Sequence, residues 1–324
     1  MSQDFRIFNI NNQLDFNELA LKIFYYQAEN VEVYKKYLYY LGIEPKSIDH
    51  VEAIPFLPIR FFKSHKVIHK NVDYEKVFLS SGTTKAIRSR HFVSSLKIYE
   101  NSFLKSFETS YGNIENYTFL ALLPSYLDQG ESSLIYMTNE LIKRANKQSK
   151  YISKIDSNTL YLLNKLASKK VILLGVSYAL LDLAEKHQLD LSNWIVMETG
   201  GMKGRRKEIT RDELHQILKK AFNVSSIHSE YGMTELLSQA YSKKDGYFNC
   251  PSWMRTEIRE INDPFKKCRE NKTGGINIID LANIYSCSFL ATDDLGKKNK
   301  KGFKVLGRFD HSDTRGCNQL TTFF

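Results

Sequence analysis

The stretch "KKVILLG" at Lys169–Gly175 is a short apolar run, and an amphipathic segment, Tyr178–His187, follows it. The same order recurs three times along the chain, with the apolar runs "VFLS" at 77–80, "YTFLALLP" at 117–124 and "NWIVMETGG" at 193–201. Alternation of this kind is typical of parallel strands joined by helices. The sequence therefore predicts an α/β fold with parallel or mixed sheets flanked by helices.

The segments on both sides of this alternation have other patterns. Residues 14–42 carry apolar side chains at helical spacing and end at a glycine, which predicts one long helix or two consecutive helices. The prolines in the segment 54–68 favour extended chain. Beyond Tyr247 short apolar runs separated by turns predict a small antiparallel β subdomain. We expect residues 1–245 to form a helical cap and an α/β core, and residues 246–324 to form the β-rich part.

The composition is that of an ordinary globular protein. The 324 residues are 42% hydrophobic and 25% charged, and these fractions exclude a disordered or collagen-like chain. The net charge of +10 admits nucleic acid as a partner, but the lysines are spread along the chain and mixed with acids, so we expect no nucleic-acid partner. The basic run Gly296–Lys304 predicts a solvated turn.

The sequence has no sign of export or of a membrane segment. Its start lacks a basic segment followed by an apolar run and a small-residue cleavage site, and no run of about 18 apolar residues occurs. We therefore expect a cytoplasmic protein without a membrane span. The cysteines lie far apart without a C-x-x-C pair, which argues against a zinc site or a disulfide framework and favours free thiols.

A cluster of small polar residues follows the apolar run at 77–79. It consists of Ser80, Ser81, Gly82, Thr83 and Thr84. A glycine lets the backbone approach a ligand closely, and small side chains leave amides and hydroxyls exposed as hydrogen-bond donors for a phosphate. Neither G-x-x-x-x-G-K-[ST] nor G-x-G-x-x-G is present. The loop is a candidate phosphate site, and an ordinary turn is the alternative.

A second turn, "EYGMTE" at 230–235, follows a short predicted strand at 226–229. The Tyr231 ring can stack on a base, and the Thr234 hydroxyl can bond a phosphate oxygen. Glu235 can hold a magnesium ion, which prefers one or two carboxylates together with substrate phosphates. A buried tyrosine and a helix-capping acid are the alternative.

Two further polar turns follow predicted strands, "FLATDDLG" at 289–296 and "VLGRFDHSDTRGC" at 305–317. Carboxylates at the end of a strand are natural partners for ribose hydroxyls, and Arg308 can neutralise a phosphate or bond the same sugar. Each stretch alone is compatible with a plain turn. The four turns together, in this order, favour a nucleotide site.

The series "SSGTT", "YGMTE", "ATDDLG" and "GRFD" is similar to the ordered motifs of adenylate-forming enzymes, the acyl-CoA synthetases and their relatives. Within that group the chain resembles the long-chain acyl-protein synthetases (LuxE type), the ligase component of bacterial fatty acid reductases. The stretches "IPFLPIRFFKSHKV", "ETGGMK", "CPSWMR" and "GRFDHSDTRGC" also carry the resemblance, which covers roughly residue 50 to the end. It implies the large N-terminal type of domain of the adenylate-forming enzymes.

The resemblance also implies a role for each matching residue. The cluster at 80–84 would cradle the ATP phosphates, Thr234 would contact the α-phosphate, and Glu235 would bind Mg²⁺. The remaining nucleotide contacts would lie on the adenine and the ribose. They are Gly200 and Gly201 against the adenine, Tyr231 stacked on it with Gly232 in the same turn, and Asp294 and Arg308 on the ribose.

The activity implied is ATP-dependent activation of a fatty acid, followed by transfer of the acyl group to a protein thiol. In the resembled family a cysteine near the C-terminus carries the acyl group as a thioester for a partner reductase, and Cys317 in "RGC" matches that position. Arg315 beside it would favour the thiolate. An ordinary cysteine is the alternative, and Cys268 in "KKCRE" is the competing thiol. Cys250 and Cys287 are predicted to be packing residues.

The sequence departs from the wider superfamily in two places. Lys85 stands where the phosphate loop usually continues with glycine. After "GRFD" the larger relatives carry a mobile C-terminal subdomain with a catalytic lysine, and we expect this subdomain to be absent here. Lys203 and Arg205 are candidates for the missing cation. His91 is a candidate phosphate contact, although a structural role is favoured. An acyl- or aryl-CoA ligase of the phenylacetate type is the alternative function, and a basic nucleic-acid-binding module is a distant third.

Overall fold

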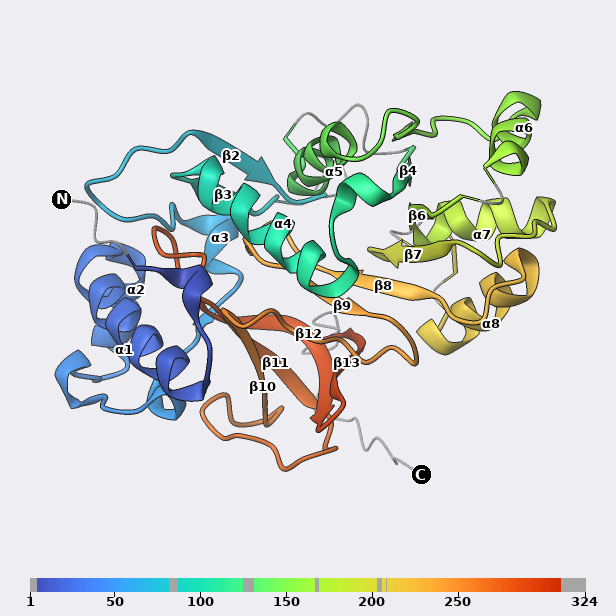
Figure 1. Ribbon diagram of the computed structural model, residues 1–324. Helices are drawn as coiled ribbons and strands as arrows, with labels where there is room; N and C mark the ends of the chain where they lie inside the picture. The colour runs from blue at the N-terminus through green and yellow to red at the C-terminus, as the bar shows by residue number, and fades with distance from the viewer. Residues whose placement is uncertain are drawn as a thin grey trace.

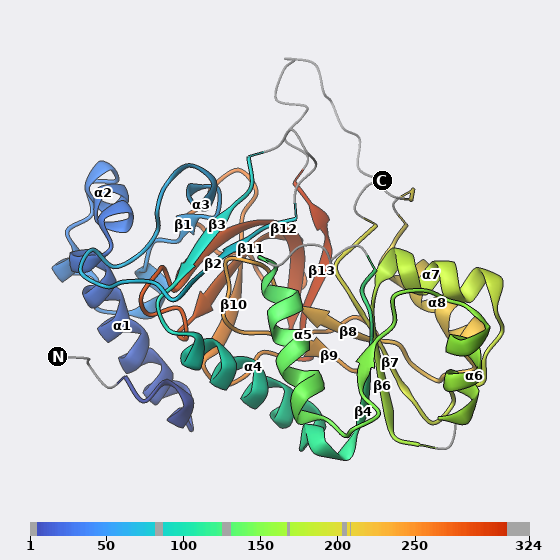
Figure 2. The same cartoon turned by 90° about the horizontal axis from the view of Figure 1, so that it is seen from above.

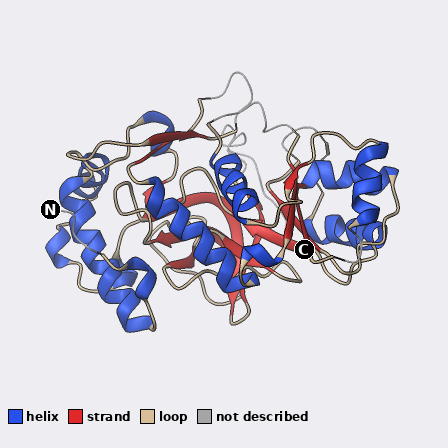
Figure 3. Ribbon diagram, turned by 45° about the horizontal axis from the view of Figure 1, so that its top comes forward, coloured by secondary structure: helices blue, strands red, loops and turns tan. Residues whose placement is uncertain are grey.

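The computed structural model of the protein describes residues 5–81, 87–124, 131–166, 169–202, 206–207 and 209–309. Helices lie at both ends of the molecule, and most of the strands lie between them together with two further helices (Figure 1, Figure 3). The α-helices are α1 (Gln13–Asn30), α2 (Glu32–Tyr40), α3 (Phe61–Ser64), α4 (Leu96–Tyr111), α5 (Ser133–Arg144), α6 (Ser157–Lys165), α7 (Ser177–Lys186) and α8 (Arg211–Phe222). Short 3₁₀ turns cover Ile7–Asn9, Pro45–Ser47, Val51–Ala53 and Ile114–Asn116.

The larger sheet has six strands in the order β5-β4-β6-β7-β8-β9, and all neighbouring pairs are parallel except β8 and β9. Its strands are β4 (Thr118–Leu122), β5 (Lys150–Tyr151), β6 (Val171–Val176), β7 (Ile195–Thr199), β8 (His228–Tyr231) and β9 (Ala240–Ser242). Helices α4 and α5 lie on one side of the sheet and α6, α7 and α8 on the other (Figure 2). This confirms the predicted α/β fold.

The second sheet has five strands and is antiparallel apart from one short parallel pair. Its strands are β1 (Leu57–Pro58), β10 (Met254–Arg259), β11 (Gly274–Asp280), β12 (Phe289–Asn299) and β13 (Gly302–Arg308). The predicted antiparallel part is therefore present. The basic run 296–304 forms the ends of β12 and β13 and the turn between them rather than a turn alone. The boundary near residue 245 stays a prediction, because β1 from the N-terminal part pairs with β12.

The run at 77–80 was expected in the parallel sheet, and this is wrong. Among the described residues, β2 (Lys76–Leu79) forms a ladder with β3 (Arg90–Val93) alone, an antiparallel one in which Phe78 is opposite His91. The chain reverses directly after β2, since the Ser80 amide donates to the Ser89 carbonyl and the Ser89 amide donates to the Ser80 hydroxyl oxygen. A reversal of this kind makes a hairpin and leaves no crossover helix.

The N-terminal segment was predicted to form either one long helix or two consecutive helices, and it forms two. Val31 between them has an extended backbone, and Gly42 after α2 has a φ of 69°, which favours glycine. A capping box formed by Thr210 and Glu213 begins α8. The segment expected to be extended, 54–68, contains the single helical turn α3, which is a partial correction.

Helix α1 packs on the five-stranded sheet and fixes the segment before β12. The buried Gln27 amide donates to the carbonyl oxygens of Asn283 and Ile284 at 2.9 and 2.8 Å, and its oxygen accepts from the Ser288 amide at 2.9 Å. A buried side chain that satisfies three backbone groups sets the position of the loop it contacts. Within the described residues, none of the helices has the length and the apolar character needed to cross a bilayer.

Candidate active site

Three of the predicted site residues meet where the ends of β8 and β13 lie beside the middle of β12. The Tyr231 hydroxyl donates to one oxygen of Asp294 at 2.8 Å, and the Arg308 guanidinium donates to the other at 3.1 Å. Asp294 and Arg308 are register partners on neighbouring strands. The Tyr231 ring is buried against Phe248 and Phe303. The structure thus joins the motifs "YGMTE", "ATDDLG" and "GRFD" in one cluster.

Arg308 is the exposed member of this cluster. Its side chain is 74% exposed, whereas that of Asp294 is 9% exposed. An exposed guanidinium moves at small cost, because an ion pair in contact with water contributes little to stability. The Asp294 carboxylate therefore has one fixed partner, the Tyr231 hydroxyl, and one partner that an incoming group can replace.

Glu235 lies close enough to this cluster for the charges there to affect the pKa of its carboxyl. Burial raises the pKa of its carboxyl, while a hydrogen bond with Ser89 and the charge of Arg308 act in the opposite direction. Within the described residues it forms no ion pair. Mg²⁺ is held by one or two carboxylates plus substrate phosphates and waters, so a single carboxylate at this turn fits that ion when it arrives with a nucleotide.

His91 holds the backbone of the same turn. One ring nitrogen lies 2.7 Å from the Thr234 carbonyl oxygen and the other 3.0 Å from the Asn283 side-chain oxygen, while the Asn283 amide donates to the Glu235 carbonyl at 2.8 Å. Burial lowers the pKa of His91 to about 4, although both hydrogen bonds act to raise it. At pH 7 the ring is neutral and donates to only one of the two oxygens at a time.

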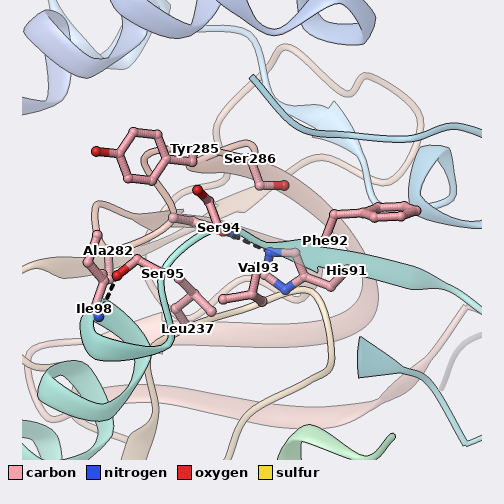
Figure 4. Close-up of a pocket in the computed structure, with 11 residues that line it drawn as sticks. His91, Phe92, Val93, Ser94, Ser95, Ile98, Leu237, Ala282, Tyr285 and Ser286 are labelled. Atoms are coloured by element: carbon pink, nitrogen blue, oxygen red, sulfur yellow. Dashed lines mark hydrogen bonds between the residues drawn. The ribbon is translucent and has the colours of Figure 1, made fainter. Parts of the chain in front are cut away.

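The His91 ring is buried. His91 on β3 lines a pocket of about 10 Å³ together with Leu237, Ala282 and Tyr285 (Figure 4). That volume is roughly enough for one water molecule. The favoured structural role of His91 therefore agrees with its contacts: it positions the turn at 234–235 rather than binding a phosphate.

Asp280, at the end of β11, holds the residues that follow the turn. Its buried carboxylate accepts from the amides of Leu237 and Ser238 at 2.8 and 3.0 Å and from the Ser238 hydroxyl at 2.5 Å. Burial raises the pKa of Asp280, against these hydrogen bonds. His91 on β3 and Asn283 thus hold the turn at 234–235, and Asp280 at the end of β11 holds the residues just after it.

Glu230 faces the opposite side of β8 from Tyr231. The buried Thr199 hydroxyl donates to its carboxylate, and this contact joins the ends of β7 and β8. Burial raises the pKa of Glu230 to about 7, against the Thr199 hydrogen bond, and the charge of Glu198 raises it further. Its carboxylate folds over the following turn, since a Cβ on Gly232 would lie 2.6 Å from the Glu230 Oε1 atom.

Glu198 on β7 has a cationic partner, whereas Glu230 forms no ion pair with the residues that the structure describes. Burial acts to raise its pKa, but Arg211, at 2.8 Å, together with His215 and Ser229, lowers the pKa to about 2. Arg211 also donates to the Val305 carbonyl oxygen at 2.9 Å. This guanidinium therefore connects the six-stranded sheet to β13.

The remaining predicted site residues fall into two groups. Ser80 and Ser81 lie at the base of the hairpin loop, and Gly200 and Gly201 follow β7, where Gly200 has a φ of 68°. Gly232 and Thr234 lie in the turn after β8. The others lie outside the described residues. They are Gly82, Thr83, Thr84, Lys203 and Cys317, with Lys85 and Arg205.

The described cysteines have the character of packing residues. Cys250, Cys268 and Cys287 form no disulfide, as predicted. Burial raises the pKa of the Cys250 and Cys287 thiols to about 12 and also raises that of Cys268. A raised pKa disfavours the thiolate, which is the nucleophilic form. All three thiols, including the competing Cys268, are therefore disfavoured as acyl acceptors.

Several polar residues of the site were not predicted. Asp280 and Asn283 have the signal of an acid and an amide directly after a strand, in "IIDLAN" at 278–283, but the sequence shows no partner for them. Within the described residues, no group of three His, Cys, Asp or Glu side chains is arranged to hold a metal ion.

No protein-family model matches the sequence, and no curated protein matches it. Solved structures do resemble it. ATP-bound MatB from Rhodopseudomonas palustris has a TM-score of 0.55 at 16% identity, over 72% of this chain and 47% of that chain. 2-Hydroxyisobutyryl-CoA ligase, in complex with 2-HIB-AMP and CoA, has a TM-score of 0.63 at 13% identity, over 93% of this chain and 69% of that one.

A third solved structure comes from Bacillus subtilis. O-succinylbenzoate coenzyme A synthetase (MenE), in complex with ATP and a magnesium ion, has a TM-score of 0.52 at 20% identity, over 72% of this chain and 49% of that chain. The chain has the fold of adenylate-forming enzymes. It spans about half the length of MatB and MenE. At these identities the likeness concerns the fold, and the closer resemblance to acyl-protein synthetases stays a prediction.

Proposed function

We propose that the protein is an ATP-dependent ligase that activates a long-chain fatty acid as its acyl-adenylate. The contact of Tyr231 with Asp294, and of Asp294 with Arg308, carries the proposal, because it unites three motifs that are up to 77 residues apart in the sequence. The fold it shares with ATP-bound MatB and MenE supports the same function.

The proposed reaction starts from two anions. A carboxylate oxygen of the fatty acid attacks the α-phosphorus of ATP, a mixed anhydride with AMP forms, and pyrophosphate leaves. Asp294 would accept hydrogen bonds from the ribose in place of Arg308, and Tyr231 would hold Asp294 while bounding the adenine site with Gly200 and Gly201. Hydroxyls and amides of the loop 80–84, with Thr234, would face the phosphates. Preorganised groups of this kind are commonly the largest catalytic contribution.

Glu235 would hold Mg²⁺, which neutralises the phosphate charge when it is bound. The chain's own contribution is to fix that carboxylate. His91 and Asn283 bond the backbone of Thr234 and Glu235, and Asp280 bonds the two amides that follow Leu236. We propose that Lys203 or Arg205 supplies the cation that assists adenylation. Substitution of each residue in turn would show which one does so.

The second step would transfer the acyl group to the chain itself. The Cys317 thiolate would attack the acyl carbon, a thioester would form, and AMP would leave. The acyl-enzyme would then deliver the group to a partner protein such as an acyl reductase. We propose a cytoplasmic location for this activity, because ATP is supplied there.

Exchange of labelled pyrophosphate into ATP tests the first step. We expect exchange that depends on Mg²⁺ and on a fatty acid such as tetradecanoate, and a panel of carboxylic acids would rank the substrates. Absence of exchange with every acid of the panel would contradict the proposal.

Labelling with radioactive tetradecanoate tests the second step. In the presence of ATP and Mg²⁺, label should stay on the wild-type chain and be released by hydroxylamine. The Cys317→Ser variant should remain unlabelled while still exchanging pyrophosphate, and Cys268→Ser, a substitution of a buried thiol, should be labelled like the wild type. Label on Cys317→Ser would show that another residue accepts the acyl group.

A CoA ligase is the second candidate, favoured by the likeness to 2-hydroxyisobutyryl-CoA ligase, a protein solved with CoA. In that case CoA, rather than Cys317, would attack the acyl-adenylate. Steady formation of acyl-CoA that Cys317→Ser leaves unchanged would favour this candidate over the acyl-protein ligase.

A further inference from the structure

The pairing of β11 with β12 contains a β-bulge. Gly275 on β11 is opposite Leu295 on β12, and the next matched pair lies two residues further along β11 but four residues back along β12. Ile276 alone therefore faces the three residues 292–294. A bulge interrupts the ladder hydrogen bonds and re-aims the side chains of the bulged strand. Because the bulge includes Asp294, it decides where the carboxylate proposed to bind the ribose lies.

The guanidinium of Arg259, the last residue of β10, supplies hydrogen bonds at this bulge. It donates to the Ile276 carbonyl oxygen on β11 at 2.9 Å and to the Thr292 carbonyl oxygen on β12 at 2.6 Å. It also donates to the side-chain oxygen of Asn277 at 2.8 Å. One rigid planar group thus bridges the two strands where their own ladder is interrupted.

Gly275 gives the guanidinium its route across β11. It is the register partner of Arg259, and a Cβ atom on it would lie 2.7 Å from both Nη atoms of that side chain. A side chain at position 275 would therefore displace the guanidinium from the bulge. A glycine at this position permits the close approach.

The Thr292 hydroxyl extends these contacts to Asp294. It donates to the Ile276 carbonyl oxygen at 2.8 Å and accepts from the Asp294 amide at 3.1 Å. The Arg259 guanidinium also lies 5.5 Å from the centre of the Phe309 ring, which follows Arg308 in the motif "GRFD". Burial lowers the pKa of Arg259, and the two adjacent aspartates of β12 oppose this shift, so the guanidinium stays charged at neutral pH.

We propose that Arg259 is a positioning residue of the nucleotide site, which holds the bulge in the shape that presents Asp294 to the ribose. The inference rests on the proposed adenylation. Without the guanidinium, carbonyl oxygens on both strands lose a donor, and the bulge is no longer held in one shape. The Asp294 carboxylate then leaves the position in which it would accept hydrogen bonds from the nucleotide.

Exchange of pyrophosphate into ATP and into 2′,3′-dideoxyATP tests this, because the second nucleotide lacks the ribose hydroxyls that would donate to Asp294. We expect the wild type to prefer ATP by about tenfold or more in kcat/KM, as for a hydrogen bond to a charged group. Arg259→Lys keeps the charge but cannot bridge two strands as a planar fork. It should lower exchange with ATP by about tenfold and exchange with the dideoxy nucleotide by about twofold or less.

Arg255→Lys is the matched control, since Arg255 lies on the same strand but donates to Asn17 on α1. It should keep the wild-type preference for ATP. Gly275→Ala, which displaces the guanidinium without changing a charge, should lose the preference as Arg259→Lys does. In the Asp294→Asn background Arg259→Lys should change exchange with ATP by about twofold or less, because the same contact is already lost.

The preference is a ratio measured on one protein sample, so a variant that is partly unfolded still reports it. If Arg259 served stability alone, its substitution would lower exchange with both nucleotides alike. That result, or equal use of both nucleotides by the wild type, would overturn the inference and leave adenylation intact. A wild type without exchange into ATP for any acid would contradict adenylation itself, and this inference with it.

Discussion

Glu230 and Tyr231 are neighbours on β8, but their side chains enter two unlike polar networks. Successive side chains of a strand point to opposite faces. Glu230 joins a sealed network with Thr199, next to Glu198 and its cation Arg211. Tyr231 joins an open network, in which Asp294 is buried but its partner Arg308 is largely exposed.

The difference separates two uses of a carboxylate. In the sealed network no partner can be exchanged, so the charges affect stability and its dependence on pH. In the open network the guanidinium can move into water and leave the carboxylate to another donor. The sealed network therefore fixes the ends of β7 and β8, and the open one is available to a ligand. The substitutions below test this division, from the largest expected effect to the smallest.

Arg211→Met should break the sealed network most strongly. It leaves the Glu198 carboxylate buried without its cation, and removing one partner of a buried pair costs about 3–5 kcal/mol of unfolding free energy. Urea denaturation at pH 7 measures the loss. Arg206→Met is the control, because Arg206 pairs with the more exposed Asp182 and Glu185 and should cost about 1 kcal/mol or less. Equal losses would show that the network is not sealed.

Glu230→Gln should change the pH dependence of stability. Below the ordinary pKa of 4.5 the carboxyl is protonated in both the folded and the unfolded chain, and between 4.5 and about 7 only the folded chain keeps the proton. Wild-type stability therefore falls as the pH rises through this window. The variant lacks this loss and should be more stable than the wild type at pH 8, by up to about 3 kcal/mol, and nearly equal to it at pH 4.

Denaturation in urea across this pH range measures the difference. Glu18→Gln, a change of an exposed residue on α1, should follow the wild type at every pH. A parallel pH profile for Glu230→Gln and the wild type would contradict the burial of an ionisable group at this position.

Asp294→Asn should disable the open network without unfolding the chain. It keeps the shape of the side chain but removes the negative charge that accepts hydrogen bonds from Tyr231 and Arg308. Pyrophosphate exchange should therefore fall on the order of 100-fold. The neighbouring Asp293→Asn, which removes a surface contact with Arg60, should stay within about twofold of the wild type. Comparable activity of the two variants would place the nucleotide elsewhere.

Tyr231→Phe should have the smallest effect. It removes one hydrogen bond to Asp294 and leaves the ring in its place between Phe248 and Phe303, so exchange should fall by about tenfold or less. Tyr117→Phe, which removes a hydrogen bond to the Tyr111 carbonyl far from the cluster, is the control. A Tyr231→Phe variant with unchanged exchange would show that Arg308 alone orients the carboxylate.

The sequence predicted the parts of the fold that depend on local pattern. The apolar runs at 119–122, 171–176 and 195–197 form most of β4, β6 and β7, as their pattern predicts. The run at 77–80 has the same local pattern but pairs as a hairpin. Its pairing is decided by contacts of Ser80 with Ser89 across the loop, which no periodicity reveals.

Only those site residues that belong to a recognisable sequence motif could be predicted. Tyr231, Asp294 and Arg308 stand in recognisable turns, and the structure brings them together. The supporting contacts could not be predicted, because they join distant segments: His91 to Thr234 spans 143 residues, and Asn283 to Glu235 spans 48. A single sequence holds no signal for such pairs.

The link from Gln27 to Asn283 and Ser288 has a consequence for how the molecule assembles. A helix near the start of the chain supplies the hydrogen bonds that settle a loop more than 250 residues later, and that loop in turn supports the turn holding Glu235. The turn that holds Glu235 therefore reaches its final position only after the segment 283–288 has packed on α1. Residues separated by most of the chain must meet before this turn is fixed.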